Sequence, residues 1–206
     1  MKAVVFGGGE IFSEYIEERP KDDDLVVCAD SGYQNALAFG VKVDILVGDF
    51  DSLCDIPEGV GEVLRVPCEK NSTDTQLAVD VALERGADEI VIVASTNGRV
   101  DHTLSSLALL EKLWDKKIPC VIVNGQNRAR FLRDSGTILI RSKYKYFSLV
   151  TLDKVAKKVS IEGAKYPLKN ANIERGFQFA VSNEIVKNAA LINVKKGSVY
   201  VIESRD

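Results

Sequence analysis

The chain has 206 residues, of which 46% are hydrophobic and 28% are charged, and its formal net charge is −3. This composition is typical of a globular protein, and no apolar run approaches the roughly 18–20 residues that a membrane helix needs. A single histidine excludes a His-rich zinc site, and the length suits one large domain or two small ones.

Short apolar segments alternate with stretches of helical spacing in the first half of the chain. Such strands between helices predict a parallel sheet covered on both faces, and therefore an α/β domain. We expect strands at Ala3–Phe6, Leu25–Ala29, Ile45–Val47, Val63–Val66, Glu89–Ala94 and Pro119–Asn124. We expect helices at Glu10–Glu18, Tyr33–Phe39, Thr75–Arg85 and Thr103–Leu113.

The pattern changes after about residue 127. Apolar runs become short and often alternate with polar residues, with turns at intervals of roughly 8–12 residues, which is typical of a β-sandwich or barrel. The runs are Tyr146–Leu152, Lys157–Glu162, Phe177–Ser182, Ala189–Val194 and Ser198–Glu203. We therefore predict an α/β domain with a mostly parallel sheet at residues 1–126 and an all-β sandwich at residues 127–206.

The charge changes at the same place. Residues 1–126 hold 11 Lys/Arg and 23 Asp/Glu, a net of −12, whereas residues 127–206 hold 16 Lys/Arg and 7 Asp/Glu, a net of +9. A step of this size suggests two units with different roles.

The N-terminus and the cysteines both favour a cytoplasmic protein. Met1–Gly7 reads as a strand running into a glycine turn and is too short for a signal peptide. Cys28, Cys54, Cys68 and Cys120 show no Cys-x-x-Cys pairing and lie in or beside apolar stretches. We expect buried free thiols in a reducing compartment.

Polar segments follow the predicted strands of the first half, at the edge where open α/β sheets bind ligands. They bring five carboxylates toward one rim: Asp30, Asp49, Asp51, Asp74 and Asp101. Crowded carboxylates repel one another, and Mg²⁺, which prefers oxygen ligands, relieves that repulsion. Asp49-x-Asp51 alone is equally typical of a solvated turn.

Gly7-Gly8-Gly9 would let the backbone approach a phosphate, although a simple tight turn fits equally well. The segment does not match Gly-x-Gly-x-x-Gly, because Phe12 stands at the last position. No Gly-x-x-x-x-Gly-Lys-[Ser/Thr] segment occurs, which excludes a P-loop mechanism.

A helix that begins at Thr73 would also form an anion-binding site at its N-terminus. Thr73 and Gln76 fit a capping box, and Asp74 in the first turn suits the helix dipole. A metal-bound phosphate would sit at the same place, within reach of Lys70, which otherwise is a solvated loop lysine.

Gly98–His102 places Arg99 beside Asp101 at a strand end. This pairing matches a phosphate clamp next to a metal-binding or basic carboxylate. The alternative is a surface ion pair in which Asp101 caps the helix that begins near Thr103. The role of His102 stays open, because a lone histidine is also typical of a packing position.

Four segments, taken in order, resemble the motifs of the thiamin pyrophosphokinase family. They are Ala29–Gly32, Val43–Ser52 with its Gly-Asp-Phe-Asp-Ser ending, Asn71–Ala78 and Gly98–His102. In the second half, Tyr166–Asn170 and Val181–Glu184 also resemble family segments. The sequence departs from the family at Ser31, at Ala94–Asn97, and in having no tryptophan after Glu184.

The resemblance implies an α/β domain that binds ATP and Mg²⁺ and a β-sandwich that helps to bind thiamin. It further implies a homodimer whose active sites form between the α/β domain of one subunit and the β domain of the other. The implied reaction moves the pyrophosphoryl group of ATP to thiamin, giving thiamin diphosphate and AMP. We expect neither nucleic acid nor a membrane as partner.

On this reading each candidate has a role. The metal ligands, direct or through water, are Asp49, Asp51 and Asp74, with Asp101 close by. Arg99 and Lys70 stabilise phosphoryl oxygens, and either Asp74 or Asp101 takes the alcohol proton. The other candidate substrate contacts are Asp30, Thr73, Gln76, His102, Ser182 and Asn183. Of these, Gln76 would face the pyrimidine edge of thiamin.

Two other functions stay open at this point. A pyrophosphokinase for another alcohol, such as 6-hydroxymethyl-dihydropterin, would keep the Asp cluster, but the thiamin-like second half argues against it. A nucleotide- or nucleic-acid-binding protein would use the basic half, but its Lys and Arg are scattered and no aromatic RNA-binding motif accompanies them.

Overall fold

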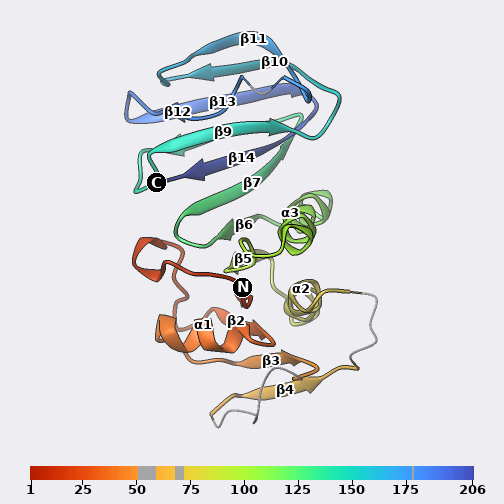
Figure 1. Ribbon diagram of the computed structural model, residues 1–206. Coiled ribbons are helices and arrows are strands. Elements are labelled where there is room, and N and C mark those ends of the chain that lie inside the picture. The colour runs from red at the N-terminus through yellow and green to blue at the C-terminus, as the bar shows by residue number, and fades with distance from the viewer. Residues whose placement is uncertain (51–58, 68–71, 178) are drawn as a thin grey trace. The chain divides into compact units, whose positions relative to one another are not determined.

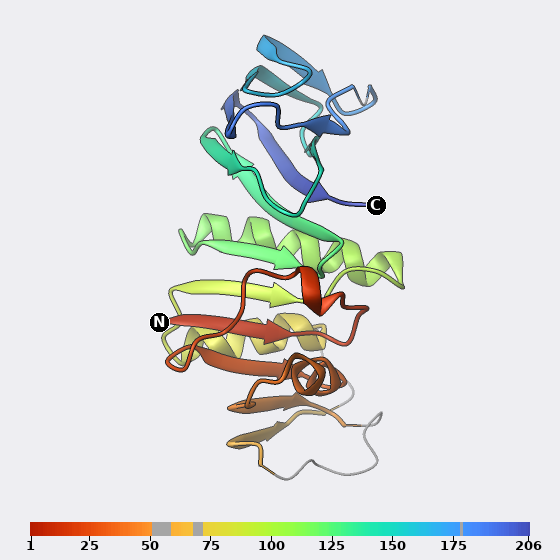
Figure 2. The ribbon, with the colours of Figure 1, turned by 90° about the vertical axis from the view of Figure 1, so that its left-hand side faces the viewer.

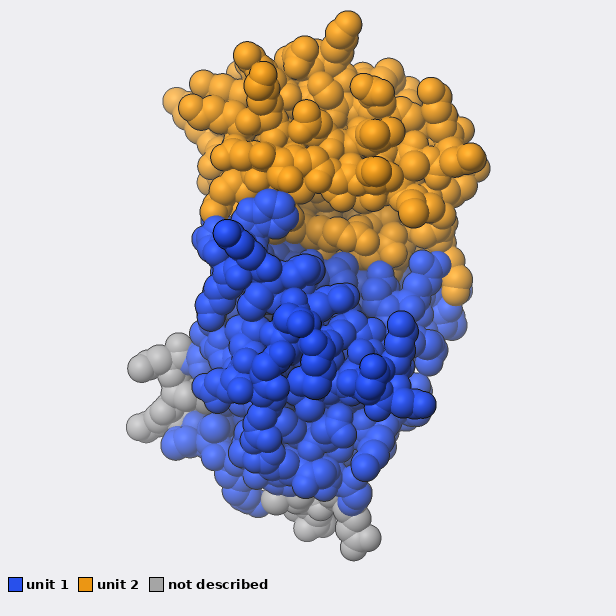
Figure 3. All heavy atoms as spheres, turned by 180° about the vertical axis from the view of Figure 1, so that it is seen from behind, with its two compact units in different colours: residues 1–125 blue, residues 126–206 orange. Residues whose placement is uncertain are grey.

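The computed structural model describes residues 1–50, 59–67, 72–177 and 179–206 (Figure 1, and Figure 2 from the side). Within these residues no helix is long and apolar enough to cross a membrane. The chain forms two compact units, Met1–Gly125 and Gln126–Asp206, coloured blue and orange in Figure 3. The boundary lies beside the charge step.

Unit 1 contains a parallel sheet with the strand order β6-β5-β1-β2-β3-β4. The strands are β1 (Lys2–Phe6), β2 (Leu25–Ala29), β3 (Ile45–Gly48), β4 (Glu62–Arg65), β5 (Glu89–Val93) and β6 (Cys120–Val123). β1 pairs with β2 on one side and with β5 on the other, so the chain order reverses there. This topological switch point is where doubly wound sheets bind ligands.

The helices of unit 1 are α1 (Gly32–Phe39), α2 (Asp74–Glu84) and α3 (Val100–Asp115). Figure 1 shows α1 on one face of the sheet and α2 and α3 on the other. Because both faces are covered, the central strands β1 and β5 are apolar after their first residue; in β1, Ala3 to Phe6 are all buried.

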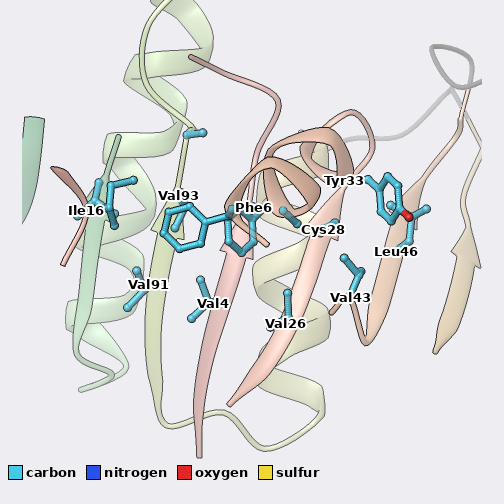
Figure 4. Packing of buried hydrophobic residues seen from close by; sticks show 14 of the residues in the cluster. Val4, Phe6, Ile16, Val26, Cys28, Tyr33, Val43, Leu46, Val91 and Val93 are labelled. Atoms are coloured by element: carbon cyan, nitrogen blue, oxygen red, sulfur yellow. The ribbon is translucent and has the colours of Figure 1, made fainter. Parts of the chain in front are cut away.

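One hydrophobic cluster in the core of unit 1 packs between α1 and the sheet (Figure 4). Phe6 of β1 meets Phe39 of α1 edge to face, with ring centroids 5.5 Å apart. Cys28 is a buried free thiol, and burial raises its pKa. Cys120 is a half-buried free thiol, whereas Cys54 and Cys68 lie outside the described residues.

The expected helix at Glu10–Glu18 is wrong. Only a 3-10 turn, η1 (Ser13–Tyr15), forms there. The N–H of Phe12 donates to the carbonyl of Asn124 at 2.8 Å, and Ile16 is buried in the core. Contacts with residues distant in the sequence thus replace the hydrogen bonds that a helix would have needed.

Unit 2 has two antiparallel sheets in its described part, with strand orders β12-β9-β14-β7 and β11-β10-β13-β8. Burial alternates along strands such as β13, which is expected when one face of an antiparallel sheet is covered. That the sheets pack as a sandwich stays a prediction. The first sheet has β7 (Asn127–Arg133), β9 (Tyr146–Thr151), β12 (Asn183–Glu184) and β14 (Ser198–Ser204). The second has β8 (Gly136–Ile140), β10 (Val155–Glu162), β11 (Leu168–Glu174) and β13 (Ala189–Lys196).

The strand expected at Phe177–Ser182 is also wrong for its described residues. Phe177 and Phe179 are exposed, and β11 forms earlier in the chain instead. β11 is an edge strand of mostly polar residues, and of these seven only Ile173 is buried. Its pairing with β10 holds it in place, so its own apolar pattern could not predict it.

Candidate active site

A pocket of about 540 Å³ opens at the carboxyl ends of β1, β2 and β5 in unit 1. It therefore lies at the switch point of the sheet. Its lining comes from the loop after β1, the end of β2, the start of α2 and the segment from β5 into α3. The lining residues are Gly8, Gly9, Glu10, Ala29, Asp30, Ser31, Thr73, Asp74, Thr75, Ala94, Ser95, Asn97, Gly98, Arg99, His102 and Ser106.

The glycine loop forms one wall because it packs directly on the segment after β5. The N–H of Gly9 donates to the carbonyl of Ala94 at 2.7 Å, and a Cβ on Gly9 would lie 2.6 Å from that oxygen. The Asn35 side chain in α1 donates to the carbonyls of Gly7 (2.7 Å) and Gly9 (2.8 Å). Close backbone approach therefore explains why glycine is needed here.

Three residues other than glycine that line the pocket have left-handed backbone conformations, and one of them is Asn97 with φ 90°. Asp30 follows β2 with φ 45°, and Ala94 follows β5 with φ 56°. Such conformations are unfavourable for an alanine, and they concentrate at functional sites where the surrounding structure holds them.

The start of α2 confirms the expected cap. The N–H of Gln76 donates to Oγ1 of Thr73 at 3.2 Å, and Asp74 lies in the first turn. Thr73 and Asp74 line the pocket, whereas Gln76 is not among the lining residues. Lys70 lies outside the described residues.

Arg99 and Asp101 are joined to each other at the start of α3. The guanidinium donates from Nη2 to Oδ2 at 2.6 Å and from Nε to Oδ1 at 3.1 Å. These hydrogen bonds lower the pKa of Asp101 to about 2. Arg99 and His102 line the pocket, but Asp101 does not.

The alternative of a surface ion pair between Arg99 and Asp101 is confirmed, but its second part is wrong, because Asp101 does not cap this helix. The helix begins at Val100 with Arg99 as its N-cap, which places Asp101 within the first turn. Its carboxylate accepts the N–H of the next residue, His102, at 2.9 Å. The helix extends three residues further toward its N-terminus than its apolar pattern indicated.

The pocket brings together only part of the predicted carboxylate rim. Asp30 and Asp74 line it; Asp49 follows β3, is half-buried and does not line it. Asp51 lies outside the described residues. Among the residues that the structure does describe, no group of three His, Cys, Asp or Glu side chains is arranged to hold a metal ion.

Comparison with known proteins identifies the family. The model for "Thiamin pyrophosphokinase, catalytic domain" matches residues 16–122, and that for "Thiamin pyrophosphokinase, vitamin B1 binding domain" matches residues 136–199. The chain belongs to the thiamin pyrophosphokinase family. The first match covers most of unit 1, including α1, α2, Arg99 and Asp101, and the second lies within unit 2.

Two relatives match most of the chain. The thiamine pyrophosphokinase of Bacillus subtilis (strain 168) is 29% identical over 209 residues, 98% of each chain. Thiamin pyrophosphokinase 1 of Caenorhabditis elegans is 25% identical over 169 residues, 77% of this chain and 69% of the relative.

Solved structures of bacterial members have the same fold. The thiamine pyrophosphokinase of Bacillus subtilis superimposes with a TM-score of 0.88 at 26% identity, covering all of both chains. The enzyme of Geobacillus thermodenitrificans gives 0.85 at 27% identity, covering 100% of this chain and 98% of the other.

The two candidates in unit 2 differ in what their polar atoms contact. Ser182 is exposed, has φ 56° and donates its N–H to Oγ of Ser148 at 3.1 Å. Asn183 is buried, and its side chain donates to the carbonyl of Tyr166 at 2.8 Å and accepts the N–H of Tyr166 at 3.0 Å. Asn183 therefore joins the two family-like segments of this unit.

Sequence reasoning missed two residues of the site. Asn35 holds the glycine loop, and no local pattern could have indicated this, because its partners are 26 and 28 residues away. Ser95 lies in the pocket with a buried hydroxyl. Its position directly after the end of a predicted strand could have indicated this role. Sequence reasoning instead assigned the site to charged residues nearby, such as Arg99 and Asp101.

Proposed function

We propose that this chain is an ATP-dependent thiamin pyrophosphokinase, which transfers the pyrophosphoryl group of ATP to the hydroxyl of thiamin. The observation that carries this is the ordered match to both family domains over residues 16–122 and 136–199. The pocket supports it, because a glycine wall, three carboxylates (Glu10, Asp30 and Asp74) and an arginine lie together at the sheet's switch point. The vitamin B1 binding match does not favour a pterin acceptor.

In the proposed reaction, the hydroxyl oxygen of thiamin attacks the β-phosphorus of ATP. The bond from that phosphorus to the oxygen that bridges it to the α-phosphorus breaks, and AMP leaves with that oxygen. Arg99 and Lys70 contact the phosphoryl oxygens, where negative charge gathers. The remaining proposed substrate contacts are Asp30, Thr73, Gln76, His102, Ser182 and Asn183.

Asp74 is the better proposed acceptor for the hydroxyl proton. A general base works best when its pKa is near the working pH, and the pKa of Asp101 is lowered to about 2 by Arg99. Asp74 also lines the pocket, whereas Asp101 does not. Asp101 then serves to orient the Arg99 guanidinium.

Mg²⁺ fits the donors that are present. Asp30 and Asp74 offer the carboxylate oxygens that Mg²⁺ prefers, and the strand end that precedes Asp49 lies against Asp30. A Cβ on Gly48 would be 3.3 Å from Oδ1 of Asp30. We assign Asp49 and Asp51 as ligands, direct or through water, and Asp74 as a ligand through water, so that its own oxygens can accept the hydroxyl proton. When bound, the ion neutralises charge on the triphosphate.

We also propose a cytoplasmic homodimer in which residues 1–126 bind ATP and Mg²⁺, and residues 127–206 bind thiamin and form the dimer. The opposite net charges, −12 and +9, favour attraction between the two kinds of unit. Such a dimer should dissociate more readily as salt rises, because exposed charges are screened. Sedimentation equilibrium measures the dissociation constant of the dimer. If that constant is the same at low and high salt, attraction between the opposite charges does not hold the dimer together.

³¹P NMR of the protein with ATP, Mg²⁺ and thiamin tests the function. AMP together with thiamin diphosphate supports the proposal; ADP, or pyrophosphorylation of a pterin alcohol in place of thiamin, overturns it. Asp74→Asn should then lower AMP release by at least about 10²-fold, the size typical of losing a general base. AMP release near the wild-type rate in that variant would contradict the role of Asp74.

A further inference from the structure

Ser95 lines the pocket and has a buried hydroxyl group. The residue is 9% exposed and lies two positions after Val93, the last residue of β5. Its Oγ has no hydrogen-bond partner among the residues that the structure describes. A buried hydroxyl without a partner destabilises a protein, so its presence in a pocket favours a ligand that supplies the partner.

The backbone around Ser95 holds that hydroxyl in place. Ala94, in its left-handed conformation, donates its N–H to the carbonyl of Val123 at 2.9 Å and accepts the N–H of Gly9 at 2.7 Å. A Cβ on Gly7 would lie 3.4 Å from Cα of Ser95, so the glycine loop packs against this residue. Ser95 is thus fixed between β6 and the glycine loop before any ligand binds.

We infer that Ser95 is a positioning residue for the nucleotide, donating a hydrogen bond from its Oγ to a ribose or phosphate oxygen of ATP. This inference rests on the proposed function. The nucleotide is favoured over thiamin because Ser95 adjoins the glycine loop, where the absence of side chains lets a ligand approach the backbone. ATP also carries many oxygen acceptors, whereas thiamin has a single hydroxyl.

Ser95→Ala tests the inference, with α,β-methylene-ATP as the probe, because that analogue cannot release AMP. We expect its Kd to rise about tenfold, the change that follows from losing about 1.4 kcal/mol of binding free energy. The KM for ATP should rise similarly, while the KM for thiamin stays unchanged. The Tm of the ligand-free protein should stay the same or rise, since a hydroxyl without a partner has been removed.

Ser198→Ala is the matched control in unit 2. Ser198 is also buried, but its Oγ accepts a hydrogen bond from Nε of Arg133 at 3.0 Å. This variant should lower the Tm and leave the Kd of the analogue unchanged. If Ser95→Ala fails to fold, Ser95→Cys replaces it, because a thiol keeps nearly the same volume but donates only weakly.

Three results overturn the inference. An unchanged Kd shows that the hydroxyl does not contact the nucleotide. If the KM for thiamin rises while the Kd of the analogue is unchanged, Ser95 contacts thiamin. If the Tm falls while the Kd of the analogue is unchanged, Ser95 binds a buried water that stabilises the fold. Failure of the proposed function is distinct: wild-type protein would bind the analogue through Ser95 and yet form no thiamin diphosphate.

Discussion

Arg99 and Asp101 form a two-point ion pair across the first turn of α3, with Nη2–Oδ2 and Nε–Oδ1 distances of 2.6 and 3.1 Å. The sequence left two interpretations open, a phosphate clamp beside a carboxylate near the metal and a surface ion pair, and the ion pair is confirmed. The pair couples the two side chains, because Asp101 fixes the plane of the guanidinium that reaches the pocket. Two parallel hydrogen bonds are the geometry that arginine provides and lysine does not.

Changing either member of this pair should lower activity. We expect Arg99→Lys to lower kcat/KM by about 10²-fold, the loss typical of one donor to a developing charge. Asp101→Asn should lower it by about tenfold, equivalent to about 1.4 kcal/mol, because the guanidinium loses its orientation. Steady-state kinetics with ATP and thiamin measures both.

A second ion pair on the same helix provides the control for these variants. Lys112 of α3 pairs with Asp80 of α2 at 2.7 Å, away from the pocket lining. Asp80→Asn should leave kcat/KM unchanged. If it lowers activity as much as Asp101→Asn does, then general loosening of α3 explains both effects.

The Asp101 carboxylate should titrate well below the physiological range. Hydrogen bonds from Arg99 lower its pKa from 3.8 to about 2. Because the folded-state pKa is the lower one, the contribution of the pair is present above about pH 3.8 and is lost as the pH falls through about 2. Carboxyl ¹³C NMR should show this midpoint, and Arg99→Ala should move it up toward 3.8. A wild-type midpoint near 3.8 would contradict the pairing.

Asn35 should matter for both stability and nucleotide binding. Asn35→Ala removes two hydrogen bonds to the glycine loop and should lower the free energy of unfolding by about 1–3 kcal/mol. Alanine is the better helix former, so any loss comes from the missing bonds. Asn35→Asp should be worse, because its carboxylate faces two carbonyl oxygens. Urea denaturation and the Kd of α,β-methylene-ATP are the measurements.

The neighbouring Gln34→Ala is the control, since Gln34 is exposed on the same helix. It should change the free energy of unfolding by no more than about 0.5 kcal/mol. Equal effects of the two substitutions would show that the glycine loop does not depend on Asn35.

Glu203 should be essential for the stability of unit 2. It is 2% exposed and accepts hydrogen bonds from Nε (2.8 Å) and Nη2 (2.6 Å) of Arg128, and another from Arg130. Glu203→Ala leaves the buried Arg128 without this counter-charge and should cost about 3–5 kcal/mol. The exposed Glu162→Ala should cost less than about 0.5 kcal/mol.

The double variant Arg128→Met with Glu203→Leu checks this explanation. It removes Glu203 together with Arg128, the more buried of its two arginine partners, so it should recover much of the stability that Glu203→Ala loses. Urea denaturation measures all three variants. A double variant no more stable than Glu203→Ala would assign the loss to packing instead.

Local patterns predicted most of unit 1. Short, continuously apolar runs such as Leu25–Ala29, followed by turn residues, favoured strands buried on both faces, and Thr73 was recognisable as a cap from its neighbours alone. The same reasoning failed at Glu10–Glu18 and at β11. In the first case a distant carbonyl, that of Asn124, takes the N–H of Phe12; in the second, β10 holds a mostly polar strand.

The sequence by itself determined the family, through motifs whose order and spacing are visible along the chain. It also determined that Asp30, Asp74 and Arg99 follow strands or begin helices, because short-range hydrophobic patterns mark those positions. Only the tertiary structure decided which of these residues share a pocket. Pairing of β1 with both β2 and β5 brings together segments nearly 90 residues apart, and it leaves Asn35 on the glycine loop and Ser95 with a buried hydroxyl. Those relationships depend on contacts between distant segments, which no local pattern of residues contains.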